Sequence, residues 1–189
     1  MSAKGNVMIT KILDTAKELF SQKGYMAVTM KDFCDCCDLS RGGLYHHFSS
    51  TKEIFIAMLD RDVDNDSHAV QQAMEGGVPA QVIFDHYLAH EKNEIFSNSR
   101  GIHFAIHEFA FVESDKRAYF DKRVEISIQL IRNLLCYGQE RGEFRGFDAN
   151  DVATHIIYFF DAMKTSTSVI TITKETVDKQ IEIIKEMIL

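Results

Sequence analysis

Residues 29–52 read TMKDFCDCCDLSRGGLYHHFSSTK, and this stretch decides the fold of the chain. Thr29 is the type of residue that caps the N-terminus of a helix, and Asp32 follows at the position of its partner in a capping box. The apolar residues that come next recur along one face of a helix; they are Met30, Phe33, Cys34 and Cys37. The pattern predicts a short helix that ends at Asp38.

A second short helix begins two residues later. Ser40 is another hydroxyl N-cap, and the helix is expected to run through Leu44 to Phe48, with its polar residues on the other side. Leu39, Leu44 and Phe48 are expected to form part of a shared core. Two short helices joined by such a tight turn form a helix-turn-helix.

At these residues the chain resembles the TetR family of bacterial transcriptional regulators. The resemblance covers about the first third of the chain, and it departs from the family pattern at Asp38, where Gly is usual, and at Gly43, where Thr, Ala or Ser is usual. The matching positions are Thr29, Phe33-Cys34, Asp38-Leu39-Ser40, the run GGLYHHF from Gly42 to Phe48, and Lys52-Glu53. The family implies DNA binding by the second helix.

A helix-turn-helix places its second helix in the major groove, where the edges of all four base pairs differ. Arg41 is the expected base-reading residue, because a guanidinium can pair with O6 and N7 of guanine; a phosphate contact is the alternative. Thr29 and Lys52 lie at helix N-termini, which favour phosphate. The expected DNA-binding residues are Thr29, Ser40, Arg41, Gly42, Gly43, Tyr45, His46 and Lys52.

Charge is unevenly divided along the chain. Its 189 residues carry a formal net charge of −7. Residues 1–59 hold seven Lys or Arg and six Asp or Glu, whereas the remainder holds fourteen and twenty-two. A DNA-binding domain needs positive charge only near the DNA, not over the whole protein. The acidic remainder of the chain is therefore compatible with a separate effector domain. The sequence contains neither a secretory leader nor an apolar run near the length of a membrane span, and we expect a cytoplasmic protein.

The whole chain is expected to be all-α, with about nine helices and no strand pattern. Residues 1–50 are expected to form a helix-turn-helix DNA-binding domain, and residues 51–189 a helical effector-binding and dimerisation domain. Ser50 with Glu53 predicts a capping box at the fourth helix, and Ser114 predicts the cap of the seventh. Helices eight and nine carry apolar stripes suited to a four-helix interface between two copies.

Aromatic and ionisable residues gather in the expected effector domain. Glu108 and Asp161 are carboxylates in apolar segments, and each needs a buried partner, which is either a cationic lipophilic ligand or an internal basic residue. An apolar helical cavity with a few polar groups is the usual ligand site. The candidate ligand-binding residues are His86, Tyr87, His90, Phe104, His107, Glu108, Phe111, Tyr119, Tyr158 and Asp161.

Two pairs of histidines leave an alternative open. His86/His90 and His103/His107 each have the i, i+4 spacing that can offer two nitrogens to a transition metal. They allow a metal-responsive regulator, or a helical metal-dependent enzyme that uses Glu108. This alternative does not account for residues 29–52, and no nucleophile motif supports it. We expect no catalytic residue, resident metal or cofactor.

The leading hypothesis is therefore a homodimeric regulator that binds a palindromic DNA operator. A small molecule bound in the effector-binding domain would release the protein from the operator, so the protein would act as a repressor. Activation by the small molecule fits the same residues. A scaffold or interaction module is a third possibility, and it predicts no salt-sensitive affinity for DNA. Among the cysteines, Cys34 and Cys37 are expected to pack inside, and Cys36 to be more exposed.

Overall fold

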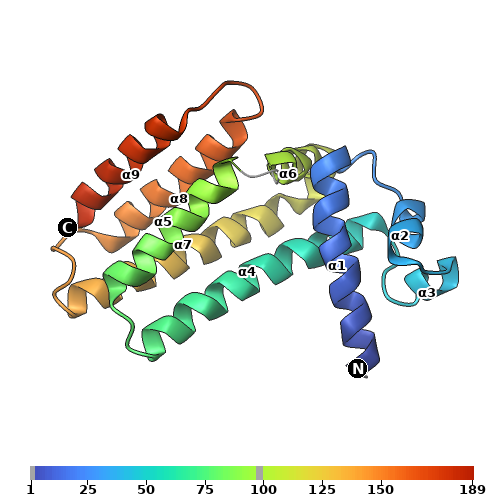
Figure 1. Ribbon diagram of the computed structural model, residues 1–189, viewed down its shortest axis with the longest axis horizontal. Helices are drawn as coiled ribbons and strands as arrows, with labels where there is room; N and C mark the ends of the chain where they lie inside the picture. The colour runs from blue at the N-terminus through green and yellow to red at the C-terminus, as the bar shows by residue number, and fades with distance from the viewer. Residues whose placement is uncertain (1–2, 97–99) are drawn as a thin grey trace. The chain divides into compact units, whose positions relative to one another are not determined.

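The computed structural model describes residues 3–96 and 100–189, and the regular secondary structure in this part of the chain is all helical, as the sequence predicts. The first four helices are α1 (Ala3–Lys23), α2 (Met30–Cys37), α3 (Arg41–Tyr45) and α4 (Thr51–Glu75). They are followed by α5 (Ala80–Phe96), α6 (Arg100–Val112), a 3-10 turn η1 (Ser114–Lys116), α7 (Arg117–Glu140), α8 (Ala149–Ser166) and α9 (Lys174–Ile188). Figure 1 labels each helix. No helix in the described ranges is both long and apolar enough to cross a membrane.

The chain divides into two compact units, and the division differs from the expected boundary after residue 50. The first unit consists of Met1–Asp64 and Gly101–Ser114, and the second of Asn65–Arg100 and Asp115–Leu189. Helix α6 therefore belongs to the unit that contains the helix-turn-helix, although it lies far from it in the sequence. Helix α4 begins in the first unit and ends in the second.

The core of the first unit is a cluster of aromatic rings. The rings of Phe20 and Phe55 meet edge to face with their centroids 4.7 Å apart, and Tyr25 lies 5.0 Å from Phe55. Phe109 of α6 completes the cluster, with its centroid 4.8 Å from both Phe55 and Tyr25. Such pairs stabilise a core beyond the area that they bury, so α6 is an integral part of this unit.

Helix α6 also approaches α1 closely at Gly101. A Cβ atom on Gly101 would lie 1.7 Å from the carbonyl oxygen of Ser21, which is far inside contact distance. Only glycine allows the two backbones to meet in this way.

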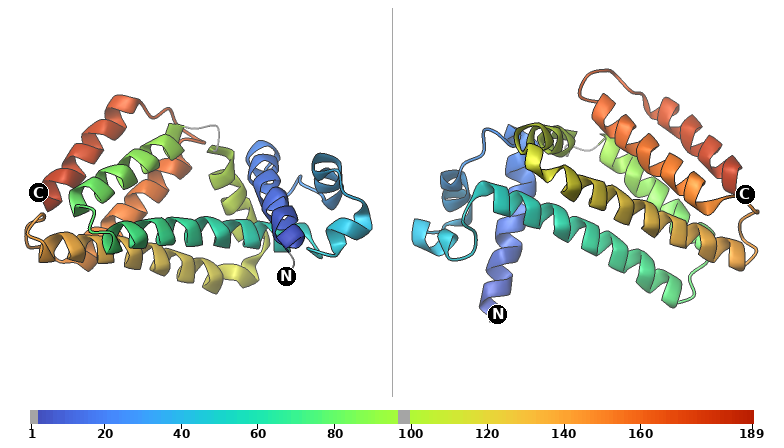
Figure 2. Two further views of the ribbon diagram at one scale, coloured as in Figure 1. Left: turned by 60° about the horizontal axis from the view of Figure 1, so that its bottom comes forward. Right: turned by 180° about the vertical axis from the view of Figure 1, so that it is seen from behind.

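The second unit is a bundle of α5, α7, α8 and α9. Its core contains Phe84 and Leu88 of α5, Leu134 of α7, Phe160 of α8 and Ile184 of α9, all of them at most 2% exposed. Figures 1 and 2 show α8 and α9 side by side. The apolar stripes predicted for these segments thus serve in part to close the unit itself.

Two predicted helix starts are wrong in detail. Ser114 does not cap α7, because residues 114–116 form the 3-10 turn η1 and α7 begins at Arg117 without a side-chain cap. Glu53 does accept hydrogen bonds at the start of α4, but from the backbone N–H and the hydroxyl of Ser49, rather than from Ser50. The hydroxyl of Ser50 accepts from the Glu53 N–H, which is the other half of the predicted box.

Candidate nucleic-acid interface

The turn between α2 and α3 depends on the backbone of Asp38. This residue has φ 56° and ψ 48°, and among the described residues it is the one non-glycine residue with positive φ. Its N–H donates to the carbonyl of Cys34, and the Nζ of Lys11 donates to the carbonyl of Cys37 at 2.8 Å. Asp tolerates the left-handed region better than most residues. The departure from glycine therefore leaves the helix-turn-helix intact.

Helix α3 presents a polar, open face. Ser40 caps it, with its hydroxyl accepting from the N–H of Gly43 at 3.1 Å, as the sequence predicts. Leu44 is fully buried, whereas Arg41 is exposed and Tyr45 is 49% exposed. A Cβ atom on Gly42 would meet nothing within 4 Å, so packing within the chain does not require glycine there.

Helix α3 is shorter than the predicted span to Phe48. It ends at Tyr45, and His46 is its C-cap, with an N–H that donates to the carbonyls of Gly42 and Leu44. Phe48 turns into the core and is 7% exposed, and Leu39 is half-buried. The two glycines weaken so short a helix, which explains why it stops early. His46 therefore lies on the turn after α3, and its side chain is exposed.

The predicted capping box at α2 is present. The Thr29 hydroxyl accepts from the N–H of Asp32 at 3.3 Å, and the Asp32 carboxylate accepts from the Thr29 N–H at 2.8 Å. Lys23 of α1 also donates to Asp32, at 2.6 Å. Lys23, and then the Thr29 hydroxyl and backbone N–H, donate to the carboxylate and lower the pKa of Asp32 to about 2. The hydroxyl of Thr29 is thus already used within the protein.

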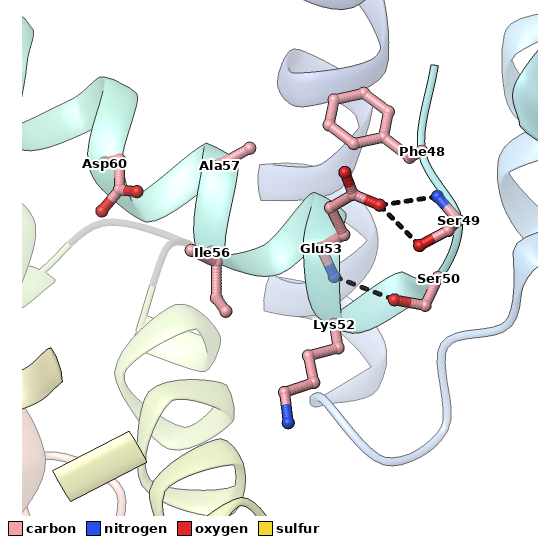
Figure 3. Close-up of a pocket in the computed structure, with 8 residues that line it drawn as sticks. All are labelled: Phe48, Ser49, Ser50, Lys52, Glu53, Ile56, Ala57 and Asp60. Atoms are coloured by element: carbon pink, nitrogen blue, oxygen red, sulfur yellow. Dashed lines mark hydrogen bonds between the residues drawn. The ribbon is translucent and has the colours of Figure 1, made fainter. Parts of the chain in front are cut away.

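The start of α4 carries Lys52 beside an open surface depression. Figure 3 shows this depression, which is lined by Phe48, Ser49, Ser50, Lys52, Glu53, Ile56, Ala57 and Asp60. The Ser49 backbone N–H and hydroxyl lower the pKa of Glu53. Lys52 points away from Glu53 (Figure 3), and its Nζ lies 2.5 Å from the Glu113 carboxylate. The residue expected at a phosphate therefore already has an anionic neighbour.

All eight residues expected at DNA fall in the first unit, on α2, α3, the turn after it and the start of α4. The sequence reasoning missed Tyr25 and Glu113. The Tyr25 hydroxyl donates to Glu113 Oε1 at 3.0 Å, across 88 positions of sequence. Burial, and then Glu113, raise the pKa of Tyr25, which keeps its hydroxyl protonated. No local pattern could have revealed a contact between such distant residues.

The candidate ligand-binding residues are divided between the two units. Phe104, His107, Glu108 and Phe111 lie on α6 in the first unit; His86, Tyr87 and His90 lie on α5, Tyr119 on α7, and Tyr158 and Asp161 on α8 in the second. Phe111 is 85% exposed and Tyr158 is 57% exposed, and His86, His90 and Asp161 are exposed as well. The two units thus hold separate groups, and this set remains a prediction.

Glu108 has a hydrogen-bond partner within the chain. Its Oε2 accepts from the backbone N–H of Tyr25 at 2.7 Å, just beyond Gly24, where α1 has ended and φ is +77°. The carboxylate thereby caps the turn after α1. This contact provides the buried partner that the sequence reasoning required, and it ties α6 to α1.

A buried ion pair in the second unit was not predicted. Lys164 of α8 lies 2.9 Å from Glu91 of α5, and the two side chains are 14% and 11% exposed. Tyr87 stands one helical turn before Glu91, and burial, and then Glu91 and Asp66, raise its pKa. These charges sit within the helix bundle, where an unpaired charge would be strongly destabilising.

The metal alternative gains no support from the structure. His86 and His90 lie in the second unit and His103 and His107 in the first. Within the described ranges, no cluster of three or more His, Cys, Asp or Glu side chains is arranged to hold a metal ion.

Comparison with known proteins agrees with the helix-turn-helix. Residues 12–58 match the family model described as bacterial regulatory proteins, tetR family. YfiR of Bacillus subtilis, an uncharacterised helix-turn-helix transcriptional regulator, is 28% identical over 140 residues, which cover 71% of this chain and 67% of YfiR. IcaR of Staphylococcus aureus, a negative transcriptional regulator of a biofilm operon, is 42% identical over 48 residues, or 25% of this chain and 26% of IcaR.

Solved structures share the fold over nearly the whole chain. The reduced form of E. coli NemR aligns with a TM-score of 0.79 and 16% identity, covering 96% of this chain and 98% of NemR. At this identity the likeness concerns the arrangement of helices and not the ligand.

Proposed function

Because the chain belongs to the tetR family of bacterial regulatory proteins, we propose that it is a cytoplasmic, homodimeric repressor that a small molecule releases from a palindromic DNA operator. It acts as a regulator and not as an enzyme. The open face of α3 carries the proposal: the buried Leu44 anchors this helix, and the exposed Arg41 and Tyr45 are left for a partner.

The proposed DNA contacts have distinct roles. Arg41 reads a base edge in the major groove, where a guanidinium pairs well with guanine. Gly42 lets the backbone approach the duplex, which fits the open space around its Cα. Tyr45 contacts phosphate, and Thr29, whose hydroxyl and N–H are bonded to Asp32, contributes by capping the N-terminus of α2, which favours phosphate. Phosphate contacts set the register without reading sequence. Ser40, Gly43 and His46 complete the surface around α3.

The proposed dimerisation through α8 and α9 is supported by the apolar side chains that these helices leave exposed. Tyr158 of α8 is 57% exposed, and Ile183 and Leu189, on α9 and at its end, are 48% and 54% exposed. Two copies of a helix pair form a four-helix interface with two-fold symmetry. Two helix-turn-helix domains related by two-fold symmetry require an operator whose half-sites are inverted repeats. The half-sites are spaced by about one turn of the DNA helix or a multiple of it.

The effector is proposed to bind in the helical body. The second unit contains aromatic residues on α5, α7 and α8. It also contains the buried Glu91–Lys164 pair. A ligand that prefers one conformation of the body shifts the DNA affinity by its differential binding, typically about 1 to 3 kcal/mol. IcaR, a negative regulator, supports repression as the sign of the response.

Selection of genomic DNA tests this proposal. The purified full-length protein is mixed with fragmented genomic DNA, and the retained fragments are sequenced. We expect enrichment of an inverted repeat, with an affinity that falls steeply as salt rises. Retention of no fragment at low salt, by a protein that is folded, would refute DNA binding.

Two substitutions then distinguish sequence-specific recognition of a base from non-specific electrostatic affinity for DNA. Arg41→Ala should reduce discrimination at one base pair of each half-site by about 1 to 3 kcal/mol. Lys122→Ala is the matched control, because Lys122 is an exposed cation on α7 in the second unit, outside α3 and outside the proposed interface of α8 and α9. Equal losses of discrimination in both variants would contradict the role of Arg41.

A further inference from the structure

Glu113 connects the end of α6 to the start of α4 within the first unit. Its Oε2 lies 2.5 Å from the Nζ of Lys52, and its Oε1 accepts from the Tyr25 hydroxyl at 3.0 Å. Each carboxylate oxygen therefore has its own donor. The lysine expected at a DNA phosphate is held by a carboxylate that lies 61 positions later in the sequence.

The surroundings hold Glu113 in place. Tyr25 is 8% exposed, and its ring packs on Phe55 and Phe109, so its hydroxyl has little freedom to move. A second carboxylate of the same helix, Glu108, accepts from the Tyr25 backbone N–H. The side chains of Lys52 and Glu113 are 34% and 21% exposed, which shields their ion pair from water more than a surface pair.

We propose that Glu113 is a positioning residue that holds the Lys52 ammonium back from the DNA backbone. The inference rests on the proposed DNA-binding function. A lysine paired with a carboxylate adds no net charge to the interface, and it displaces fewer counterions from the duplex than a free lysine does. The carboxylate also repels a nearby phosphate. The DNA affinity of this conformation is thus lowered by the Glu113–Lys52 ion pair, and breaking the pair raises the affinity for DNA.

A double-mutant cycle tests the inference. The operator fragment selected by the wild-type protein is titrated with wild type, Glu113→Gln, Lys52→Gln and the double variant, by fluorescence anisotropy over a range of salt concentrations. Glu113→Gln should tighten the Kd about two- to fivefold at ~0.1 M salt, as expected for loss of a partly shielded ion pair. It should also steepen the salt dependence by up to about 0.9 in the logarithmic slope.

The effect must depend on Lys52. In the Lys52→Gln background, Glu113→Gln should change the logarithm of the Kd by less than half as much. The reason is that this background lacks the ammonium group that Glu113 would otherwise hold. Glu18→Gln is the charge control: it removes one exposed carboxylate of the first unit outside this network. A gain in affinity from Glu18→Gln as large as that from Glu113→Gln would overturn the inference, as would weaker binding by Glu113→Gln.

A measurement without DNA separates this inference from the proposed function. The rate at which an amine-reactive acylating reagent modifies Lys52 is followed by peptide mass spectrometry, with thermal unfolding as the check on folding. Glu113→Gln should make Lys52 react faster, and an unchanged rate in a folded variant would overturn the pairing. If no variant binds DNA, the proposed function fails and the inference fails with it. If all bind alike, the inference alone fails.

Discussion

Replacing Phe109 by alanine tests whether α6 is part of the first unit. Phe109 is fully buried, and its ring lies 4.8 Å from the rings of Phe55 and Tyr25. Truncation of a buried Phe costs about 3 to 5 kcal/mol, which is a large part of the total stability of a typical domain. We expect Phe109→Ala to lower the free energy of unfolding by that amount.

Phe104→Ala is the matched control on the same helix. Phe104 is 51% exposed, so its truncation should cost less than about 1 kcal/mol. Urea denaturation followed by circular dichroism measures both variants. Hydrogen exchange resolved by peptide then locates the loss: amides of residues 3–64 should exchange faster in Phe109→Ala, and those of α8 and α9 should change far less.

Two results would refute the reasoning. One is an equal cost for Phe109→Ala and Phe104→Ala, since the burial of the two rings differs so widely. The other is faster exchange confined to residues 117–188, which would mean that α6 stabilises the helical body and not the helix-turn-helix.

Three further predictions concern the backbone and the acid stability of the first unit. Asp38→Gly should be more stable than Asp38→Ala by about 1 to 2 kcal/mol in urea denaturation, because a left-handed residue with a Cβ is strained; equal stabilities would contradict the observed φ of 56°. Gly101→Ala should destabilise the protein by more than about 2 kcal/mol in the same assay, because its Cβ would collide with the Ser21 carbonyl and neither backbone can yield cheaply; a neutral effect would exclude so close an approach. Asp32 has a pKa lowered from 3.8 to about 2, so its ionised form stabilises the folded protein above pH 3.8, and this contribution disappears as the pH falls towards 2. The stability difference between wild type and Asp32→Asn should therefore shrink over that range in acid titrations of thermal unfolding, and a constant difference would contradict the assignment.

Local chemistry made the helix-turn-helix predictable from the sequence. The caps Thr29 with Asp32 and Ser40 with Gly43 involve residues three positions apart, and both are present in the structure. The buried Leu44 and Phe48 follow from the same short-range pattern. Helix propensity and capping act over a few residues, so a sequence displays them directly.

The contacts of α6 could not be predicted for the opposite reason. Glu108 and Tyr25 are 83 positions apart, and the apolar sequence of α6 predicts that the helix is buried without showing against what. The hydrogen bond between Glu108 and the Tyr25 backbone could therefore not be foreseen, and the place of Glu108 in a ligand site stays a prediction. The end of α3 was placed too late because the apolar spacing continues to Phe48 after the helix has stopped at Tyr45.

The return of residues 101–114 to the first unit matters for anyone who recombines such regulators. A chimaera that joins residues 1–64 of this chain to the body of a relative would confront Tyr25 and Phe55 with a foreign sixth helix. To swap operator specificity cleanly, a graft should carry two segments, residues 1–64 and 101–114, into the new host.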